Sequence, residues 1–256
     1  MTTQHSSPAH ERTILFDFDG TVSLGTGPVF AYARAASAAL PPSDAGSFLD
    51  AVATALAQTP SGQRPGTTAI DGYDLVRLMS AEYGIDPAGL GAAYLQSRAQ
   101  LASDLAPVVA PQGLADFLRF ARAHANIVLA TNAPDIRVTE ALDALGLAGL
   151  FDTVYTSVGK PVGLDSVLDD WLPHGALLSI GDVWINDLAP AAARNALTAL
   201  VGSSAGSATP TYRAEHLHEL YPAIAAWLEA DAAPTVLDTP SATAPTTTTK
   251  GSPRVL

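Results

Sequence analysis

The stretch ILFDFDGT, residues 14–21, is the feature that most constrains what this chain can fold into. An unbroken apolar run is typical of a strand that is buried on both faces of a parallel sheet. This run ends at two carboxylates, Asp17 and Asp19, and Gly20 follows them. Burying two like charges so close together is costly unless a positive charge lies beside them. Taken alone, the pattern also fits a solvated Asp-Gly turn after a strand, so the rest of the chain has to distinguish the two interpretations.

Strand and helix patterns alternate along the second half of the chain. Short apolar runs at 126–131, 153–157, 176–181 and 198–202 are separated by stretches with helical periodicity. This alternation predicts an α/β fold with a parallel sheet.

Two of the predicted helices carry clear boundary signals. The helix after residue 131 would have Pro134 in its first turn and Gly146 at its end. A closing helix is predicted over 212–230, with Pro222 starting a second segment or bending it.

The segment between the first two strands breaks the alternation. It contains no convincing strand and four Ala/Leu-rich helical patterns, at 28–40, 47–58, 69–83 and 87–105. We therefore predict an all-helical insert placed directly after the first strand.

The chain divides accordingly into four parts. The core is predicted to comprise 12–21 and 113–230, with the helical insert at 22–112. Residues 1–11 and the Pro/Thr-rich segment 231–256 offer too little apolar surface for a packed structure and are expected to be disordered.

The composition excludes some classes of partner. The 256 residues include 25 acidic and 13 basic side chains, and the formal net charge of -12 disfavours binding to nucleic acid or to anionic membrane surfaces. The chain has no cysteine, so any metal must be bound by oxygen or imidazole. It shows neither an apolar signal segment nor a run of about 18 apolar residues. We expect a soluble cytoplasmic protein, either a monomer or a homodimer.

Polar side chains follow each of the first four predicted strands. In an open parallel sheet, ligands bind outside the carboxyl ends of the strands. These side chains are therefore expected to lie along one edge of the sheet. In chain order they are Asp17 and Asp19, Thr131 and Asn132, Lys160, and Asp182 with Asp187.

Each of these residues also has an ordinary structural interpretation. Asp187 could be the N-cap of the following helix, and Thr131 and Asn132 could be capping residues as well. Lys160 could be an exposed surface lysine. Their order after successive strands favours a shared site over these separate explanations.

In these residues the sequence resembles the haloacid dehalogenase-like (HAD) hydrolase superfamily. The four motifs of that superfamily occur in order as DFDGT, ATN, GKP and GDVWIND, and the resemblance covers about residues 12–230 without the insert. It implies a Rossmann-like core, with the helical insert serving as a cap domain. Only about 28 residues separate Asn132 from Lys160, which leaves no room for a cap at the alternative position.

The resemblance also implies roles for the two aspartates and for the residues around a phosphoryl group. Asp17 would attack phosphorus and form an aspartyl-phosphate, while Asp19 would protonate the leaving group and later activate water. The start of the helix near Pro134 would favour the same anion. The residues implied to surround the phosphoryl group are Thr131, Asn132, Lys160 and Gly20.

The same resemblance implies an Mg²⁺ ion, which suits a site made of oxygen ligands. Its ligands would be the Asp17 carboxylate, the Asp19 backbone carbonyl and the Asp182 carboxylate. Asp187 would be an outer or water-mediated partner that orients Asp182 and Lys160.

These features predict a Mg²⁺-dependent phosphomonoester hydrolase that acts on a small phosphorylated metabolite. A phosphotransferase or mutase of the same superfamily is the alternative, because the motifs do not determine what attacks the aspartyl-phosphate. A dehalogenase is disfavoured because that branch of the superfamily lacks the second aspartate, which is Asp19 here. A non-catalytic binding protein is disfavoured because all four motifs are present. The cap would select the substrate, with Arg64 in the loop at 61–68 expected to contact it.

Overall fold

The computed structural model describes residues 9–58, 69–202 and 208–230. Its centre is a parallel six-stranded sheet with the order β3-β2-β1-β4-β5-β6, which confirms the predicted α/β class. The segments 1–8 and 231–256 and the loop with Arg64 lie outside the described residues. The strands are β1 (Arg12–Phe16), β2 (Asn126–Ala130), β3 (Thr153–Tyr155), β4 (Ala176–Gly181), β5 (Leu197–Val201) and β6 (Tyr212–Ala214).

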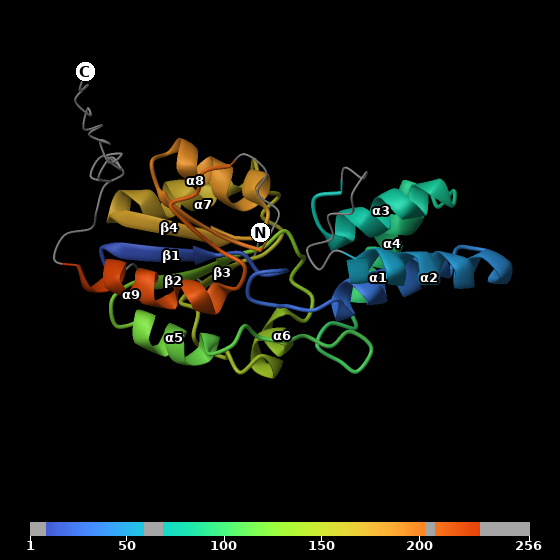
Figure 1. The fold of residues 1–256 in the computed structure, drawn as a ribbon, viewed down its shortest axis with the longest axis horizontal. Coiled ribbons are helices and arrows are strands. Elements are labelled where there is room, and N and C mark those ends of the chain that lie inside the picture. Colours follow the sequence, from blue (N-terminus) through green and yellow to red (C-terminus); the bar gives the residue numbers. More distant parts are fainter. Residues whose placement is uncertain (1–8, 59–68, 203–207, 231–256) are drawn as a thin grey trace, which may run out of the picture.

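Helices cover both faces of this sheet (Figure 1). Side chains alternate across a strand, so Ile14 and Phe16 of β1 pack into one apolar cluster while Leu15 packs into another on the opposite face. This two-sided burial explains the continuous apolar run. The first cluster includes α5 (Leu114–Ala121), α6 (Val138–Ala144) and α9 (Tyr221–Glu229), and the second includes α7 (Leu164–Trp171) and α8 (Ala189–Ala193).

The strand order places a topological switch point between β1 and β4. From β1 the chain runs outward through β2 and β3, then returns to β4 on the other side and continues to β5 and β6. Phe16 is paired with Ile180, and the Asp17 N–H donates to the Ile180 carbonyl at 2.9 Å. Open parallel sheets bind ligands at such a point, outside the carboxyl ends of the strands.

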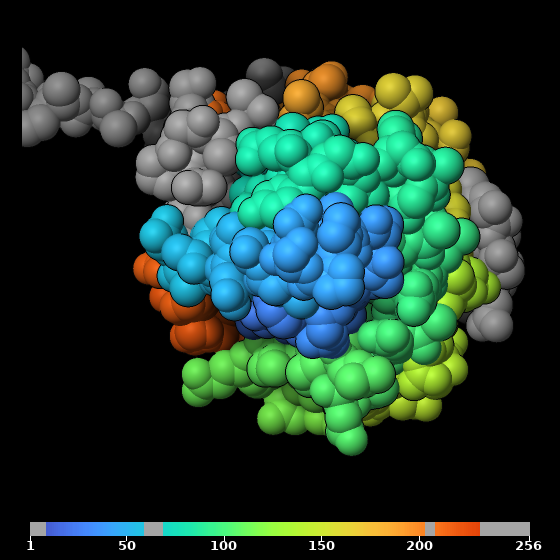
Figure 2. Space-filling model, turned by 90° about the vertical axis from the view of Figure 1, so that its right-hand side faces the viewer, coloured from blue at the N-terminus to red at the C-terminus, as the bar shows by residue number. Residues whose placement is uncertain are grey.

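Helices α1 to α4 lie beyond that end of the sheet. In Figure 1 the arrow of β1 points toward them, and Figure 2 shows their blue to green residues covering the centre of this face. They share an apolar cluster of their own that includes Phe48, Val52 and Leu75. We call them the helical cap; its boundaries as a domain stay a prediction. The helices are α1 (Gly27–Ser37), α2 (Pro42–Gln58), α3 (Gly72–Glu82) and α4 (Pro87–Arg98).

The cap helices differ from their predicted bounds, most clearly at the end of α4. The pattern extended to residue 105, but the helix ends at Arg98. Ala102 adopts a left-handed backbone conformation with φ 58°, and Leu101 packs into a cluster of the sheet rather than into the cap. Contact with the core therefore overrides the local helical pattern.

The helix predicted to begin near Pro134 begins at Val138 instead. The residues before it are hydrogen-bonded to the end of β3 and to the segment that follows β3. The Thr131 N–H donates to the Tyr155 carbonyl at 2.9 Å, and the Val158 N–H donates to the Thr131 carbonyl at 3.0 Å. The Ser157 N–H also donates to the Ala133 carbonyl at 2.7 Å, so the residues directly before Pro134 are bonded to a neighbouring segment and the helix begins four residues later.

The predicted closing helix over 212–230 is also wrong in its first part. Tyr212–Ala214 form β6, which pairs with β5. A 3₁₀ turn, η3 (Leu217–Leu220), follows, and α9 then begins at Tyr221 with Pro222 in its first turn. The expectation that Pro222 starts a new segment is confirmed. No helix in the described part of the chain is long and apolar enough to cross a membrane.

Residues 9–11, expected in the disordered N-terminus, are held against the sheet. The buried side chain of Asn126 accepts hydrogen bonds from the N–H groups of Ala9 (2.8 Å) and His10 (3.2 Å). Its amide donates to the carbonyls of His10 (2.8 Å) and Arg12 (3.1 Å). One amide side chain therefore satisfies four backbone groups at the start of β1.

We predict that Asn126→Leu destabilises the fold, because similar volume is kept while four backbone groups lose their partner. The free energy of unfolding should fall by about 2–3 kcal/mol, measured by chemical denaturation. Gln96→Leu on the exposed surface of α4 is the control and should change it by less than about 0.5 kcal/mol. Equal midpoints for the parent and Asn126→Leu would contradict this account.

Candidate active site

The predicted site residues converge at the switch point between β1 and β4. Seven of them line one cavity of about 170 Å³, while Gly20 lines an adjacent cavity together with Asp19 and Asp182. Asp71, Tyr73 and Tyr94 of the cap form part of the wall of the first cavity. The seven predicted residues that line it are Asp17, Asp19, Thr131, Asn132, Lys160, Asp182 and Asp187.

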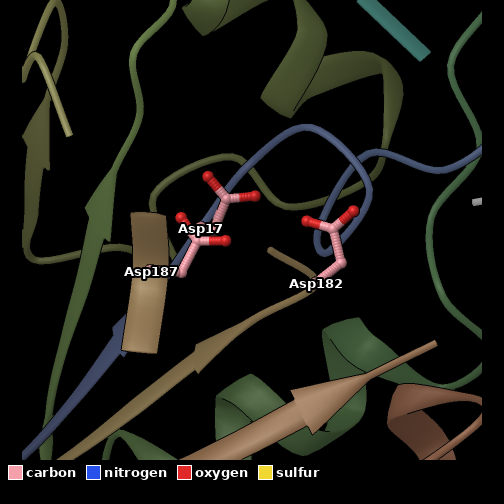
Figure 3. Close-up of side chains that lie close together, drawn as sticks. All are labelled: Asp17, Asp182 and Asp187. Atoms are coloured by element: carbon pink, nitrogen blue, oxygen red, sulfur yellow. The ribbon is translucent and has the colours of Figure 1, made fainter. Parts of the chain in front are cut away.

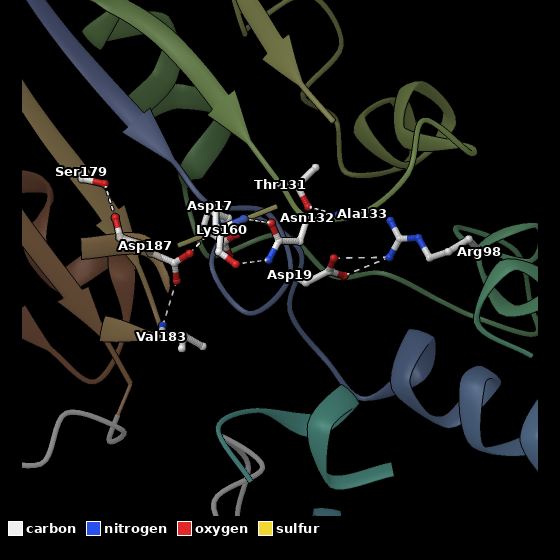
Figure 4. Close-up of polar contacts among 10 residues, drawn as sticks. All are labelled: Asp17, Asp19, Arg98, Thr131, Asn132, Ala133, Lys160, Ser179, Val183 and Asp187. Carbon is white, nitrogen blue, oxygen red and sulfur yellow. Dashed lines mark hydrogen bonds and ion pairs between the residues drawn. The ribbon is translucent and has the colours of Figure 1, made fainter. Parts of the chain in front are cut away.

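Lys160 lies at the centre of this group (Figure 4). Its Nζ is 2.5 Å from Asp17 Oδ1 and 2.6 Å from Asp187 Oδ1, and only 3% of its side chain is exposed. The interpretation of Lys160 as a surface lysine is therefore wrong. Although burial alone would lower the pKa of Lys160, the two carboxylates raise it above its usual range, so the lysine stays positively charged.

At the strand ends, the ionised forms of Asp17 and Asp182 are disfavoured. Burial, with Asp187 nearby, raises the pKa of Asp17 to about 7 although Lys160 opposes the shift. Burial raises the pKa of Asp182 well above its usual range, and the charges of Asp17 and Asp187 add to that effect. One lysine does not compensate three carboxylates, so the site favours a further cation.

The donor set fits a hard divalent cation. Asp17, Asp182 and Asp187 each place one carboxylate oxygen within 4.8 Å of the others (Figure 3). All of these donors are oxygens, which is the preference of Mg²⁺. Gly20 allows the Asp19–Gly20 loop to approach Asp182, because a Cβ at Gly20 would lie only 2.4 Å from Asp182 Oδ2. Its φ of 92° also favours glycine.

Asp187 has its carboxylate oxygens occupied by protein groups. Oδ1 contacts Lys160, and Oδ2 accepts a hydrogen bond from the Val183 N–H at 3.0 Å. Asp187 lies in a single π-helical turn, η2 (Trp184–Leu188), and its carbonyl accepts from the Ser179 hydroxyl at 2.7 Å. It does not cap α8, so the N-cap interpretation is wrong. These contacts suit an outer partner that orients Lys160 more than a direct metal ligand.

Thr131 and Asn132 form hydrogen bonds that fix the loop after β2. The Thr131 hydroxyl accepts from the Ala133 N–H at 3.0 Å. Asn132 Oδ1 accepts from the Lys160 N–H at 2.6 Å, and its amide donates to the Lys160 carbonyl at 3.3 Å. Because α6 begins only at Val138, the expected helix N-terminus behind these residues is absent. Asn132 instead fixes the backbone that carries the catalytic lysine candidate.

Asp19 turns away from Lys160 and toward the cap. Arg98 Nη1 of α4 lies 3.2 and 3.3 Å from its two carboxylate oxygens, and the Tyr73 hydroxyl donates to Oδ1 at 3.1 Å. The Arg98 side chain is 1% exposed and that of Asp19 is 24% exposed. Figure 4 shows this ion pair joining the loop after β1 to the cap.

The four sequence motifs do not include the cap residues of the site. Tyr94 and Arg98 are four residues apart on one helix, so they share a face. That spacing is the one local signal that could have pointed to them.

No protein-family model matches the chain, and no curated protein matches it either. Solved structures do match it. YfnB from Bacillus subtilis, a candidate HAD-hydrolase bound to magnesium, gives a TM-score of 0.55 at 19% identity, with 84% of this chain and 99% of YfnB covered. A HAD phosphatase from Thermococcus onnurineus gives 0.52 at 16% identity, with coverages of 83% and 97%. An L-2-haloacid dehalogenase gives 0.52 at 16% identity, with coverages of 85% and 100%.

Sequence identities of 16–19% support a shared fold but do not establish a shared reaction. Two of these matches are a phosphatase and a dehalogenase, so the fold alone accommodates different chemistries. The resemblance indicated by the four motifs is confirmed at this level: the chain has the fold of the haloacid dehalogenase-like hydrolases.

Proposed function

We propose that the chain is a Mg²⁺-dependent phosphomonoester hydrolase that works through an aspartyl-phosphate on Asp17. The observation that carries this proposal is the pairing of Asp17 with Lys160 in a cavity that Asp19 also lines. A nucleophile, a cation for the phosphoryl oxygens and a separate carboxyl for proton transfer are the groups that phosphoryl transfer requires.

In the first step a carboxylate oxygen of Asp17 attacks phosphorus as the bond to the leaving oxygen breaks. Asp19 takes up a proton on substrate binding, which weakens its ion pair with Arg98, and gives that proton to the leaving oxygen, so the leaving group departs as an alcohol. Lys160 attracts the phosphoryl oxygens, and Asp187 keeps the lysine charged and in place.

In the second step water attacks the phosphorus of the aspartyl-phosphate. Asp19, now a carboxylate, accepts a proton from the water, and Asp17 is released together with phosphate. Asp17 and Asp182, with the Asp19 carbonyl, would hold the Mg²⁺ ion, which supplies positive charge to the phosphoryl oxygens. Because the dehalogenase branch lacks the second aspartate, the presence of Asp19 favours phosphoryl transfer over dehalogenation. If an acceptor other than water attacked the aspartyl-phosphate, the chain would be a phosphotransferase.

The two aspartates should respond differently to substitution. Asp17→Asn removes the nucleophile and should reduce turnover to near background with every substrate. Asp19→Asn should lower kcat/KM for alkyl phosphates about 10²- to 10⁴-fold, because their leaving oxygen needs a proton. The burst of nitrophenol from an aryl phosphate should suffer much less, because that leaving group is weakly basic. Parent rates for Asp19→Asn on alkyl phosphates, or metal-dependent activity in Asp17→Asn, would refute the mechanism.

Asp19→Asn should also destabilise the protein, since it leaves the buried charge of Arg98 without its counter-ion. A cost of about 3 kcal/mol corresponds to a Tm lower by roughly 6–12 °C. Arg98→Met should cost less, because Asp19 is partly exposed and can be solvated. Combining the two substitutions should restore part of the Tm lost in Asp19→Asn. Identical melting of Asp19→Asn and the parent would show that Arg98 does not depend on this pair.

Mg²⁺ affinity should rise with pH. The ion binds the ionised form of Asp17, whose pKa is raised to about 7 by burial, so a proton must be released below that pH. Between pH 6 and pH 8 the ionised fraction of Asp17 increases about tenfold, and the affinity for Mg²⁺ should rise by at least that factor, because the pKa of Asp182 is raised as well. Calorimetric titration of the protein with Mg²⁺ measures this directly. Asp17→Asn should bind more weakly with a smaller pH dependence, whereas equal affinity of the parent at both pH values would contradict the assignment.

A further inference from the structure

The cap side of the cavity is chemically distinct from the core side. Asp71, Tyr73 and Tyr94 line the cavity from the cap, whereas Asp17 and Asp182 directly follow β1 and β4. In the proposed reaction the phosphoryl group lies at the strand ends. The leaving group must then extend toward these three cap residues.

Asp71 carries a charge that its structural role does not require. It is the N-cap of α3, where Oδ1 accepts a hydrogen bond from the Asp74 N–H at 2.7 Å. Asparagine or serine would cap the helix equally well. Burial raises the pKa of Asp71, and the negative charges of Asp74 and Asp19 contribute to that shift. The residue thus adds a carboxylate to a region that is already acidic.

Nothing in the described part of the chain neutralises Asp71. Lys160 is paired with Asp17 and Asp187, and Arg98 is paired with Asp19. Arg77 of α3 is paired with Asp74 and is largely exposed.

Two phenol rings, those of Tyr73 and Tyr94, line the cavity together with Asp71. Tyr73 and Tyr94 make an edge-to-face contact with ring centroids 5.9 Å apart, and Tyr32 packs against both rings at 6.2 and 5.7 Å. This three-ring cluster orients Tyr73 and Tyr94 before any ligand binds. Electron-rich aromatic faces attract cations, most strongly where water is excluded.

The net charge of the cavity also argues against a second anion on the substrate. Among the described residues that line it there are five carboxylates and one cationic side chain, Lys160. With Arg98 and a bound divalent ion included, the site is left with about one negative charge when Asp19 is ionised and is neutral when Asp19 carries the proton it donates, so no positive charge is in excess before the phosphate dianion enters. A carboxylate or second phosphate on the leaving group would add to this repulsion.

We propose that the substrate is a short phosphomonoester with an ammonium group on its leaving alcohol, and that this group binds between Asp71, Tyr73 and Tyr94. This inference rests on the proposed hydrolase function. A cavity of about 170 Å³ suits a phosphoryl group with a leaving group of only a few heavy atoms. Asp71 selects the ammonium group by charge, while the two tyrosines enclose it.

Three phosphomonoesters of similar size test the inference. These are 2-aminoethyl phosphate, the neutral propyl phosphate and the anionic carboxymethyl phosphate. In the presence of Mg²⁺, kcat/KM should be about tenfold higher for the amine than for the neutral ester, and lower again for the anion. Release of phosphate is measured for each ester, with an aryl phosphate as a general substrate.

Asp71→Asn provides the decisive variant, because it keeps the helix cap and removes the charge. It should reduce the amine-to-neutral ratio of kcat/KM about tenfold. Asp86→Asn is the matched control: Asp86 caps α4 through the same kind of bond, to the Gly89 N–H at 2.8 Å, and does not line the cavity. It should leave the ratio unchanged.

The outcomes separate this inference from the proposed function. If the aryl phosphate is hydrolysed but the amine is not preferred, or if Asp71→Asn keeps the preference, the ammonium subsite is wrong and the hydrolase function stands. If no phosphomonoester is hydrolysed with Mg²⁺, the proposed function is wrong and the subsite inference is wrong with it.

Discussion

The buried ammonium of Lys160 is the interaction on which the rest of the site depends. Burying a lysine is unfavourable unless carboxylates lie beside it, and here Asp17 and Asp187 both contact Nζ. Those carboxylates and Asp182 then exceed the positive charge available from the side chains that line the cavity. The imbalance is unfavourable in the metal-free protein, and in the proposed reaction a divalent ion relieves it. The excess of buried carboxylates therefore lowers the stability of the folded protein, and the same excess creates a site for a cation and a phosphoryl group.

Much of the core could be predicted from the sequence, because its strands are short apolar runs and each ends at a polar residue. A buried parallel strand imposes that pattern whatever its neighbours are. Where tertiary bonds compete with local signals, prediction failed. Pro134 is typical of a helix start, yet the residues at 131–133 are hydrogen-bonded to the end of β3 and the segment after it, and the helix begins at Val138.

The cap side of the site could not be predicted for a different reason. Arg98 and Asp71 belong to helices whose amphipathic patterns give their buried face but not their position over the sheet. The contact of Arg98 with Asp19 and the place of Asp71 in the cavity wall depend on how the cap packs against the loop after β1, which no local pattern encodes. The motifs of the core are recognisable because their residues are close in sequence to the strand ends. The cap residues carry no comparable signal, apart from the four-residue spacing of Tyr94 and Arg98.

Asp19 connects these two halves of the site. Its backbone follows β1 directly, whereas its carboxylate is held by Arg98 and Tyr73 of the cap. Tyr73 also forms part of the wall that the leaving group would contact. In the proposed reaction, one tyrosine therefore touches both the proton donor and the group that needs the proton. Displacing the cap would remove two partners of Asp19 at once, so recognition of the leaving group and the placement of its acid depend on the same packing of α3 and α4 over the sheet.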